Sequence, residues 1–193
     1  KTEQYHADGV KTINNYINTA NLKLGITHST DFQVVIATLN TSKIINGGAI
    51  IKKSDFGGLT FRIKQNLWGN DNSNTALAIL PFVSAPVNSD SKLSGGIILP
   101  FAMSLAHGWD FGSQVEADLA ANQTGKNYHF YFLASATTSY SLCRNLDFFT
   151  EVVVTRDNET KMYEYFINGG PIYAVAKNVN LDGGIYYGIK NIS

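Results

Sequence analysis

The regular alternation of apolar and polar residues is the feature that most constrains the fold of this 193-residue chain. Residues 59–64 read Leu-Thr-Phe-Arg-Ile-Lys, and residues 115–119 read Val-Glu-Ala-Asp-Leu. A period of two places successive side chains on opposite faces of a β-strand, and the period of a helix is nearly absent. The sequence therefore predicts an all-β chain built from antiparallel strands.

Ten segments carry this strand pattern, and most have the length of a membrane-crossing strand. They lie near residues 20–26, 32–36, 59–67, 75–84, 97–105, 109–119, 128–142, 146–155, 163–175 and 181–189. Two of them, 75–84 and 163–175, have no clean polar face. A strand of about eleven residues tilted by about 40° spans about 25–28 Å, which matches the apolar band of an outer-membrane barrel.

The predicted connections alternate between short turns and longer loops along the whole chain. The short ones fall near 28–31, 69–74, 106–108, 143–145 and 177–179, and the long ones near 40–57, 87–95, 121–127 and 156–162. This asymmetry is typical of outer-membrane barrels, whose periplasmic turns are tight and whose extracellular loops are longer. It predicts an up-and-down transmembrane β-barrel with the long loops outside.

Aromatic residues gather near the ends of the predicted strands, as they do where rings sit at a lipid–water boundary. They are Trp68, Trp109, Phe111, Tyr140 and Phe148 by the short turns, and Tyr128, Tyr163 and Tyr165 by the long loops. Alternation alone leaves two arrangements open, because the apolar face can point inward in a soluble barrel or outward into lipid. Strand length, turn asymmetry and aromatic ends favour the membrane barrel.

Charged residues of the strands share the polar face with Ser, Thr, Asn, Gln and Gly. In a membrane barrel this face lines the lumen. The predicted lumen-lining residues are Lys23, Arg62, Lys64, Asp110, Glu116, Asp118, Asp147, Glu151 and Asp182. Basic residues come from the early strands and acidic ones from the later strands, so the two signs are predicted to face each other across the lumen.

The charge balance and the cysteine count exclude several other classes of protein. Fifteen Lys and Arg balance fifteen Asp and Glu, so no net field attracts nucleic acid. A single cysteine, Cys143, excludes an internal disulfide framework and a thiolate zinc cluster. No apolar stretch approaches the ~18 residues of a transmembrane helix.

The sequence offers little support for catalysis or for a bound cofactor. Its four histidines lack metal-ligand spacing and are predicted to be solvated at turns and strand ends. The closest approach to a nucleophile, base and acid is Ser104, His107 and Asp110, at a short turn. Glu116 and Asp118 could act as an acid–base pair, but a hydrated lumen wall is the simpler interpretation. We expect no enzyme activity, no metal and no cofactor.

Several stretches resemble the outer-membrane transporters grouped as the "MetA-pathway of phenol degradation" family. They read LKLGITHSTDFQV (22–34), GLTFRIKQNL (58–67), LAILPFVSAPV (77–87) and LDGGIYYGI (181–189), and residues 95–109 also match. The match lies in pattern and spacing and contains no catalytic signature. The resemblance implies a bacterial outer-membrane β-barrel that passes small, aromatic or hydrophobic compounds.

The sequence as a whole predicts one β-barrel domain over residues 1–193, located in the bacterial outer membrane. Barrels of this family usually close with a further strand, so we expect ten of twelve strands, with parts of the first and last strands lacking. The predicted function is a passive channel whose partners are outer-membrane lipid and a small solute. The alternatives are a secreted or periplasmic ligand-binding barrel and a structural barrel with a plugged lumen.

Overall fold

The computed structural model describes residues 2–7, 10–46, 49–55, 58–69, 73–85, 92–122, 127–176 and 179–192. Within these residues, thirteen strands form a single sheet. The strands are β1 (Thr2–Ala7), β2 (Val10–Gly25), β3 (Thr30–Asn46), β4 (Ala49–Asp55), β5 (Gly58–Trp68), β6 (Thr75–Ala85), β7 (Ser94–Ser104), β8 (Trp109–Ala121), β9 (Tyr128–Cys143), β10 (Leu146–Asp157), β11 (Met162–Ala176), β12 (Val179–Asp182) and β13 (Ile185–Ile192). A short 3-10 helix, η1 (Ala106–Gly108), joins β7 to β8.

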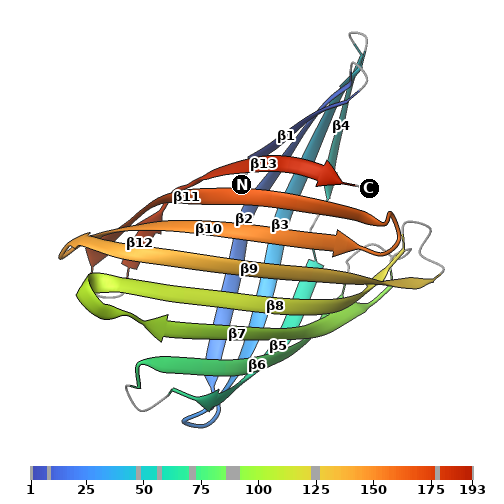
Figure 1. Cartoon of the computed structure of the whole chain (residues 1–193). Helices are drawn as coiled ribbons and strands as arrows, with labels where there is room; N and C mark the ends of the chain where they lie inside the picture. The colour runs from blue at the N-terminus through green and yellow to red at the C-terminus, as the bar shows by residue number, and fades with distance from the viewer. Residues whose placement is uncertain are drawn as a thin grey trace.

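The sheet is antiparallel and follows chain order, which confirms the predicted all-β, up-and-down fold. Figure 1 shows it curling, so that β6–β11 and β13 lie in front of β2, β3 and β5. Among the described residues the sheet is not closed: β1 pairs only with β2, and β12 and β13 pair only with β11. No helix in the described chain is long and apolar enough to cross a membrane.

The structure has thirteen strands where ten were predicted, because two strands lie outside the ten predicted segments and the last predicted segment is divided in two. Residues 2–7 pair with the first half of β2. The predicted long loop 40–57 instead contains the end of β3 and all of β4, paired from Asn40–Asp55 to Asn46–Ala49. The polar and glycine-containing sequence here resembles a loop, but the pairing supplies the hydrogen bonds of a strand. Figure 1 shows these pairs projecting beyond the rest of the sheet.

The last predicted strand, 181–189, is divided in two by a break at Gly183 and Gly184. On either side of the break, β12 and β13 both pair with β11. The backbone of Gly183 approaches Gly170 so closely that a Cβ on Gly170 would collide with the Gly183 carbonyl oxygen and lie 2.8 Å from the Gly184 Cα. Glycine is therefore required at position 170 because another backbone occupies the space of its side chain.

We expect the substitution Gly170→Ala to destabilise the fold by about 1–3 kcal/mol, because overpacking displaces the backbone at the break. Gly183→Ala is the matched control, since a Cβ there meets no atom within 4 Å. Denaturant unfolding of both variants measures the difference in free energy. Equal stability of the two variants would contradict this account of the break.

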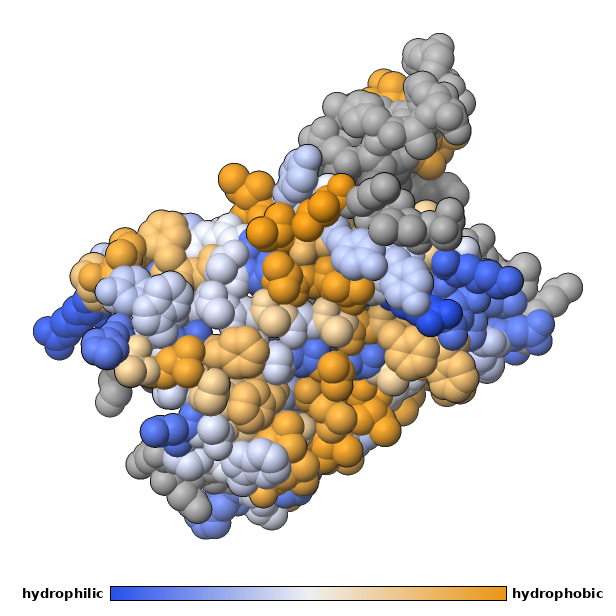
Figure 2. All heavy atoms as spheres, viewed as in Figure 1, coloured by the Kyte–Doolittle hydropathy of each residue, from blue (hydrophilic) through white to orange (hydrophobic). Residues whose placement is uncertain are grey.

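The two faces of the curled sheet differ in exposure, and the apolar face is the exposed one. Val115 is 52% exposed and Ile63 is 49% exposed, whereas Gln33 and Asn168 are each only 4% exposed. A curved sheet shields its concave side, so we call the less exposed side the inner face. Figure 2 shows apolar residues across the middle of the visible outer face and polar residues toward the strand ends. This is the reverse of the usual pattern in a soluble domain.

Candidate functional site

Six of the nine predicted lumen-lining residues are partly buried and three are exposed. The partly buried residues are Arg62, Lys64, Glu116, Asp118, Asp147 and Glu151. The exposed residues, Lys23, Asp110 and Asp182, lie near the strand ends that meet the short turns. Among the partly buried residues, Arg62 lies within electrostatic range of both Glu116 and Asp118. The structure therefore groups one predicted cation with two predicted carboxylates.

Strand pairing places Arg62 and Asp118 in one continuous row across six strands. Each member of this row lies opposite the next: Gln33 on β3, Arg62 on β5, Phe82 on β6, Gly96 on β7, Asp118 on β8 and Tyr131 on β9. Each is buried or partly buried, and exposed apolar residues such as Phe61, Ile63 and Ala117 flank it. We call this row of the inner face the belt.

Within the belt, the side chains of Arg62 and Asp118 lean toward each other over the two strands that separate them. The Arg62 guanidinium carbon lies 5.8 Å from the centre of the Phe82 ring, in a cation–π arrangement. The Asp118 carboxylate covers Gly96, because a Cβ on Gly96 would collide with Asp118 Oδ1. Glycine at position 96 thus leaves the space that this carboxylate occupies.

Two polar atoms of the belt are buried without a hydrogen-bond partner, namely Arg62 Nε and Asp118 Oδ1. One is a donor and the other is an acceptor. Glu116, two residues along β8 on the same face, accepts a hydrogen bond from Gln114 Nε2 at 3.2 Å. Among the described residues of the belt, only these two buried side-chain atoms lack a partner, because the Asp118 carboxyl is itself hydrogen-bonded to Glu116.

An apolar patch of the inner face borders the belt on β6 and β7. It consists of the buried residues Ala78, Leu80 and Ile98, against which Phe82 packs. Leu80 and Ile98 are cross-strand partners, one step along from the Phe82–Gly96 pair. This patch explains why segment 75–84 lacks a polar face in the sequence: both sides of β6 carry apolar residues.

The inner face of β10 and β11 carries hydrogen-bonded polar residues beside the buried Val153. Asn168 Nδ2 donates to Glu151 Oε2 at 2.6 Å, and Thr155 Oγ1 lies 3.5 Å from Glu164 Oε2. Thr155 and Asn168 are buried despite their polarity. Hydrogen bonding offsets the cost of burying such groups. Glu151, predicted from the sequence to line the lumen, therefore belongs to a fixed polar wall.

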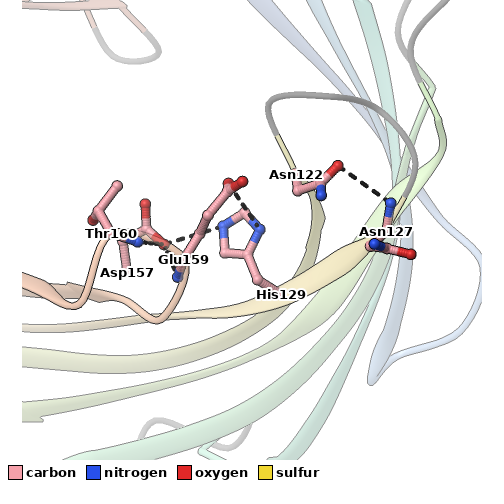
Figure 3. Close-up of polar contacts among 6 residues, drawn as sticks. All are labelled: Asn122, Asn127, His129, Asp157, Glu159 and Thr160. Atoms are coloured by element: carbon pink, nitrogen blue, oxygen red, sulfur yellow. Dashed lines mark hydrogen bonds and ion pairs between the residues drawn. The ribbon is translucent and has the colours of Figure 1, made fainter.

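A second charged cluster lies at the long-loop end of β9 and β10 (Figure 3). His129 lies between two carboxylates, with Nε2 3.2 Å from Asp157 Oδ1 and Nδ1 3.4 Å from Glu159 Oε2. The same Asp157 oxygen accepts a hydrogen bond from the Glu159 amide at 2.7 Å. The prediction of a solvated histidine was wrong here, because the His129 side chain is only 16% exposed. His28 and His107 are exposed, as predicted.

Sequence reasoning missed Gln33, Phe82, Gly96 and Tyr131 because their roles depend on register. Their only signal is the alternation itself, since each takes an inner position on its strand. In the described part of the chain, no group of three or more His, Cys, Asp or Glu residues is arranged to hold a metal ion.

Comparison with known proteins identifies the family. No curated protein matches the chain. A family model described as "Putative MetA-pathway of phenol degradation" matches residues 2–192, which is nearly the entire sequence. This match confirms the resemblance that the strand segments indicated. The chain therefore belongs to the MetA-pathway of phenol degradation family.

Proposed function

We propose that this protein is a passive channel of the bacterial outer membrane that passes small, aromatic or hydrophobic molecules and has no enzyme activity. The observation that carries the proposal is the exposure of the apolar outer face, while the charged and polar strand residues lie on the inner face together with an apolar patch. Lipid contact accounts for the outer face, and a water-filled lumen accounts for the inner one. The family description supports a link to aromatic compounds.

The arrangement of the connections supports an orientation in that membrane. The connections 86–93, 122–127 and 158–161 share one end of the strands, and the connections 26–29, 69–74, 105–108 and 144–145 share the other. The first set contains the longest of these connections, 86–93, but 158–161 is no longer than 26–29, and 69–74 is as long as 122–127. In this proposal the first set faces outside, as the long loops of such barrels do. The partners are outer-membrane lipid and a small solute. Nucleic acid is not a partner, because the chain has no net charge.

A structural barrel with a plugged lumen is the second candidate, favoured by one observation. Ala78, Leu80 and Ile98 are buried on the inner face, so side chains fill part of this side of the sheet. A secreted or periplasmic ligand-binding barrel is disfavoured, since its apolar face would point inward and its exposed face would be polar.

Gel migration and planar-bilayer recordings test the proposal together. The folded protein is expected to require detergent or lipid and to migrate differently on SDS gels before and after boiling. In planar bilayers it is expected to give stepwise ion conductance. A folded, lipid-embedded protein without conductance would support the plugged barrel. A protein that stays folded and monodisperse without detergent would contradict both membrane interpretations.

A further inference from the structure

The outer face of β5–β11 carries a single charged strand residue, Arg156. Every other Asp, Glu, Lys, Arg or His of these described strands takes an inner position of the alternation. Arg156 is exposed, whereas its chain neighbours Thr155 and Asp157 are buried or partly buried on the inner side. A charge on a lipid-contacting surface is costly unless it lies at the membrane boundary or has a partner there. Arg156 therefore needs an explanation.

The neighbours of Arg156 on the outer face are aromatic. Its cross-strand partners are Phe132 on β9 and Tyr163 on β11. The Arg156 guanidinium carbon lies 5.1 Å from the centre of the Tyr163 ring, in a cation–π arrangement. Among the described residues no carboxylate pairs with Arg156, and the adjacent Asp157 pairs with His129 on the inner side instead. The Tyr163 ring covers one face of the guanidinium and leaves N–H donors at its edge.

Arg156 lies at the height where a lipid headgroup is expected. It is the penultimate residue of β10 and belongs to the end of the strands that the proposed function places outside. Tyr128 and Tyr163 lie on the outer face at the same end, and such rings mark the boundary between lipid and water.

A second cation lies on the outer face at this end. Lys92 precedes β7 and is exposed, and its Nζ lies 5.4 Å from the centre of the Tyr128 ring. Tyr128 is two strands from Tyr163 and four residues along β9 from the row of Phe132. Strand spacing and residue rise therefore separate the two aromatic rings by about 16 Å. Two ring-supported cations thus flank β8 and β9 on a face whose strands are otherwise uncharged.

The chemistry of this surface restricts what binds to it. A ligand needs an apolar body to cover the outer face and anionic groups to reach the two cations. Phosphate suits the arginine, because a guanidinium donates two parallel hydrogen bonds to its oxygens. A lipid with two separated phosphates matches two separated cations. In the outer leaflet of a bacterial outer membrane, the lipid A part of lipopolysaccharide has this chemistry.

We infer that Arg156 with Tyr163, and Lys92 with Tyr128, bind the two phosphates of a lipid A molecule on the outer face of the sheet. This inference rests on the proposed function, since it requires that the outer face contacts lipid and that this end of the strands faces outside. It specifies the lipid partner and the residues that recognise it. The acyl chains of the lipid lie on the apolar residues below, such as Phe130 and Val154.

Native mass spectrometry of the refolded protein in detergent tests this site by titration with three lipids. They are diphosphoryl lipid A, monophosphoryl lipid A and phosphatidylglycerol. We expect the wild type to bind diphosphoryl lipid A most tightly. Arg156→Met is expected to weaken that binding about fivefold, because a basic residue near a lipid surface contributes about that factor. Arg144→Met is the matched control and is expected to bind as the wild type does, since Arg144 is exposed at the opposite end of β10.

Two further variants test the roles of the two cations. Arg156→Lys keeps the charge but loses the paired donors, so its affinity is expected to lie between those of the wild type and Arg156→Met. Lys92→Met is expected to reduce the preference for two phosphates over one, and it replaces Arg156→Met if that variant does not fold. The gel shift on boiling reports folding of each variant.

The outcomes separate this inference from the proposed function. Wild-type affinity for diphosphoryl lipid A in folded Arg156→Met, or equal wild-type affinity for lipid A and phosphatidylglycerol, would overturn the site. Conductance together with either result would leave the channel standing. Lipid A binding that depends on Arg156, in a wild-type protein without conductance, would support the site and refute the channel.

Discussion

Replacing Val115 by arginine is expected to destabilise the folded protein in a bilayer by about 2–4 kcal/mol, whereas Gln114→Arg is expected to change its stability little. Val115 lies at the middle of β8 on the exposed apolar face, and an arginine at the bilayer midplane carries this cost. Gln114 is its immediate neighbour on the inner face and already donates a hydrogen bond to Glu116. An arginine there keeps a donor beside a carboxylate.

This comparison distinguishes a membrane barrel from a soluble one, because the two interpretations predict opposite orders. In water, an arginine at an exposed position such as 115 changes the stability of the fold little. An arginine forced into a partly buried position such as 114 destabilises the fold more. Reversible unfolding in lipid vesicles measures both variants. A larger loss for Gln114→Arg than for Val115→Arg would contradict the assignment of the faces.

Converting Glu116 and Asp118 to amides is expected to lower the cation preference of the channel by up to about fivefold per carboxylate. Two unit charges about 4 Å apart in water interact by about 1 kcal/mol, which corresponds to about a fivefold change in ion preference and sets the upper limit for each carboxylate. The described inner face is predominantly acidic, since Glu116, Asp118, Glu151 and Glu164 are partly buried there, so the wild type is expected to prefer cations. Reversal potentials in a salt gradient measure the preference.

Glu159→Gln, at an exposed position in the connection between β10 and β11, serves as the control for this second prediction and is expected to leave the selectivity nearly unchanged. The amide variant should still show the gel shift on boiling, because the substitutions preserve side-chain volume. Unchanged selectivity in a folded, conducting amide variant would remove Glu116 and Asp118 from the ion pathway.

The fold class followed from the sequence because side-chain alternation is a direct consequence of strand geometry. The pattern around Phe61, Arg62 and Ile63 matches the exposure of these residues in the structure. The pairing of β4 with β3 could not be predicted, since residues 40–57 do not alternate and their strand conformation depends on a partner. The break at Gly183 was likewise hidden, because it depends on the close approach to Gly170.

The candidate site could be predicted only in part. Alternation identified Arg62, Glu116 and Asp118 as residues of the polar face, but it gave no distances between them. Their grouping depends on the register of β5 through β8, which aligns residues far apart in the sequence. Gly96 has no side chain that could mark it in the sequence. Its role depends on Asp118, whose carboxylate occupies the space of a side chain at position 96.

The measurement that tests the central claim most directly is the solvent accessibility of two neighbouring positions of β8 in a bilayer. A spin label on cysteine at position 115 or 116, in a chain with Cys143→Ser, reports contact with oxygen dissolved in lipid or with a nickel complex dissolved in water. The account predicts a lipid-exposed label at 115 and a water-exposed label at 116. Water exposure at 115 together with exclusion of both reagents at 116 would contradict it and identify a soluble barrel.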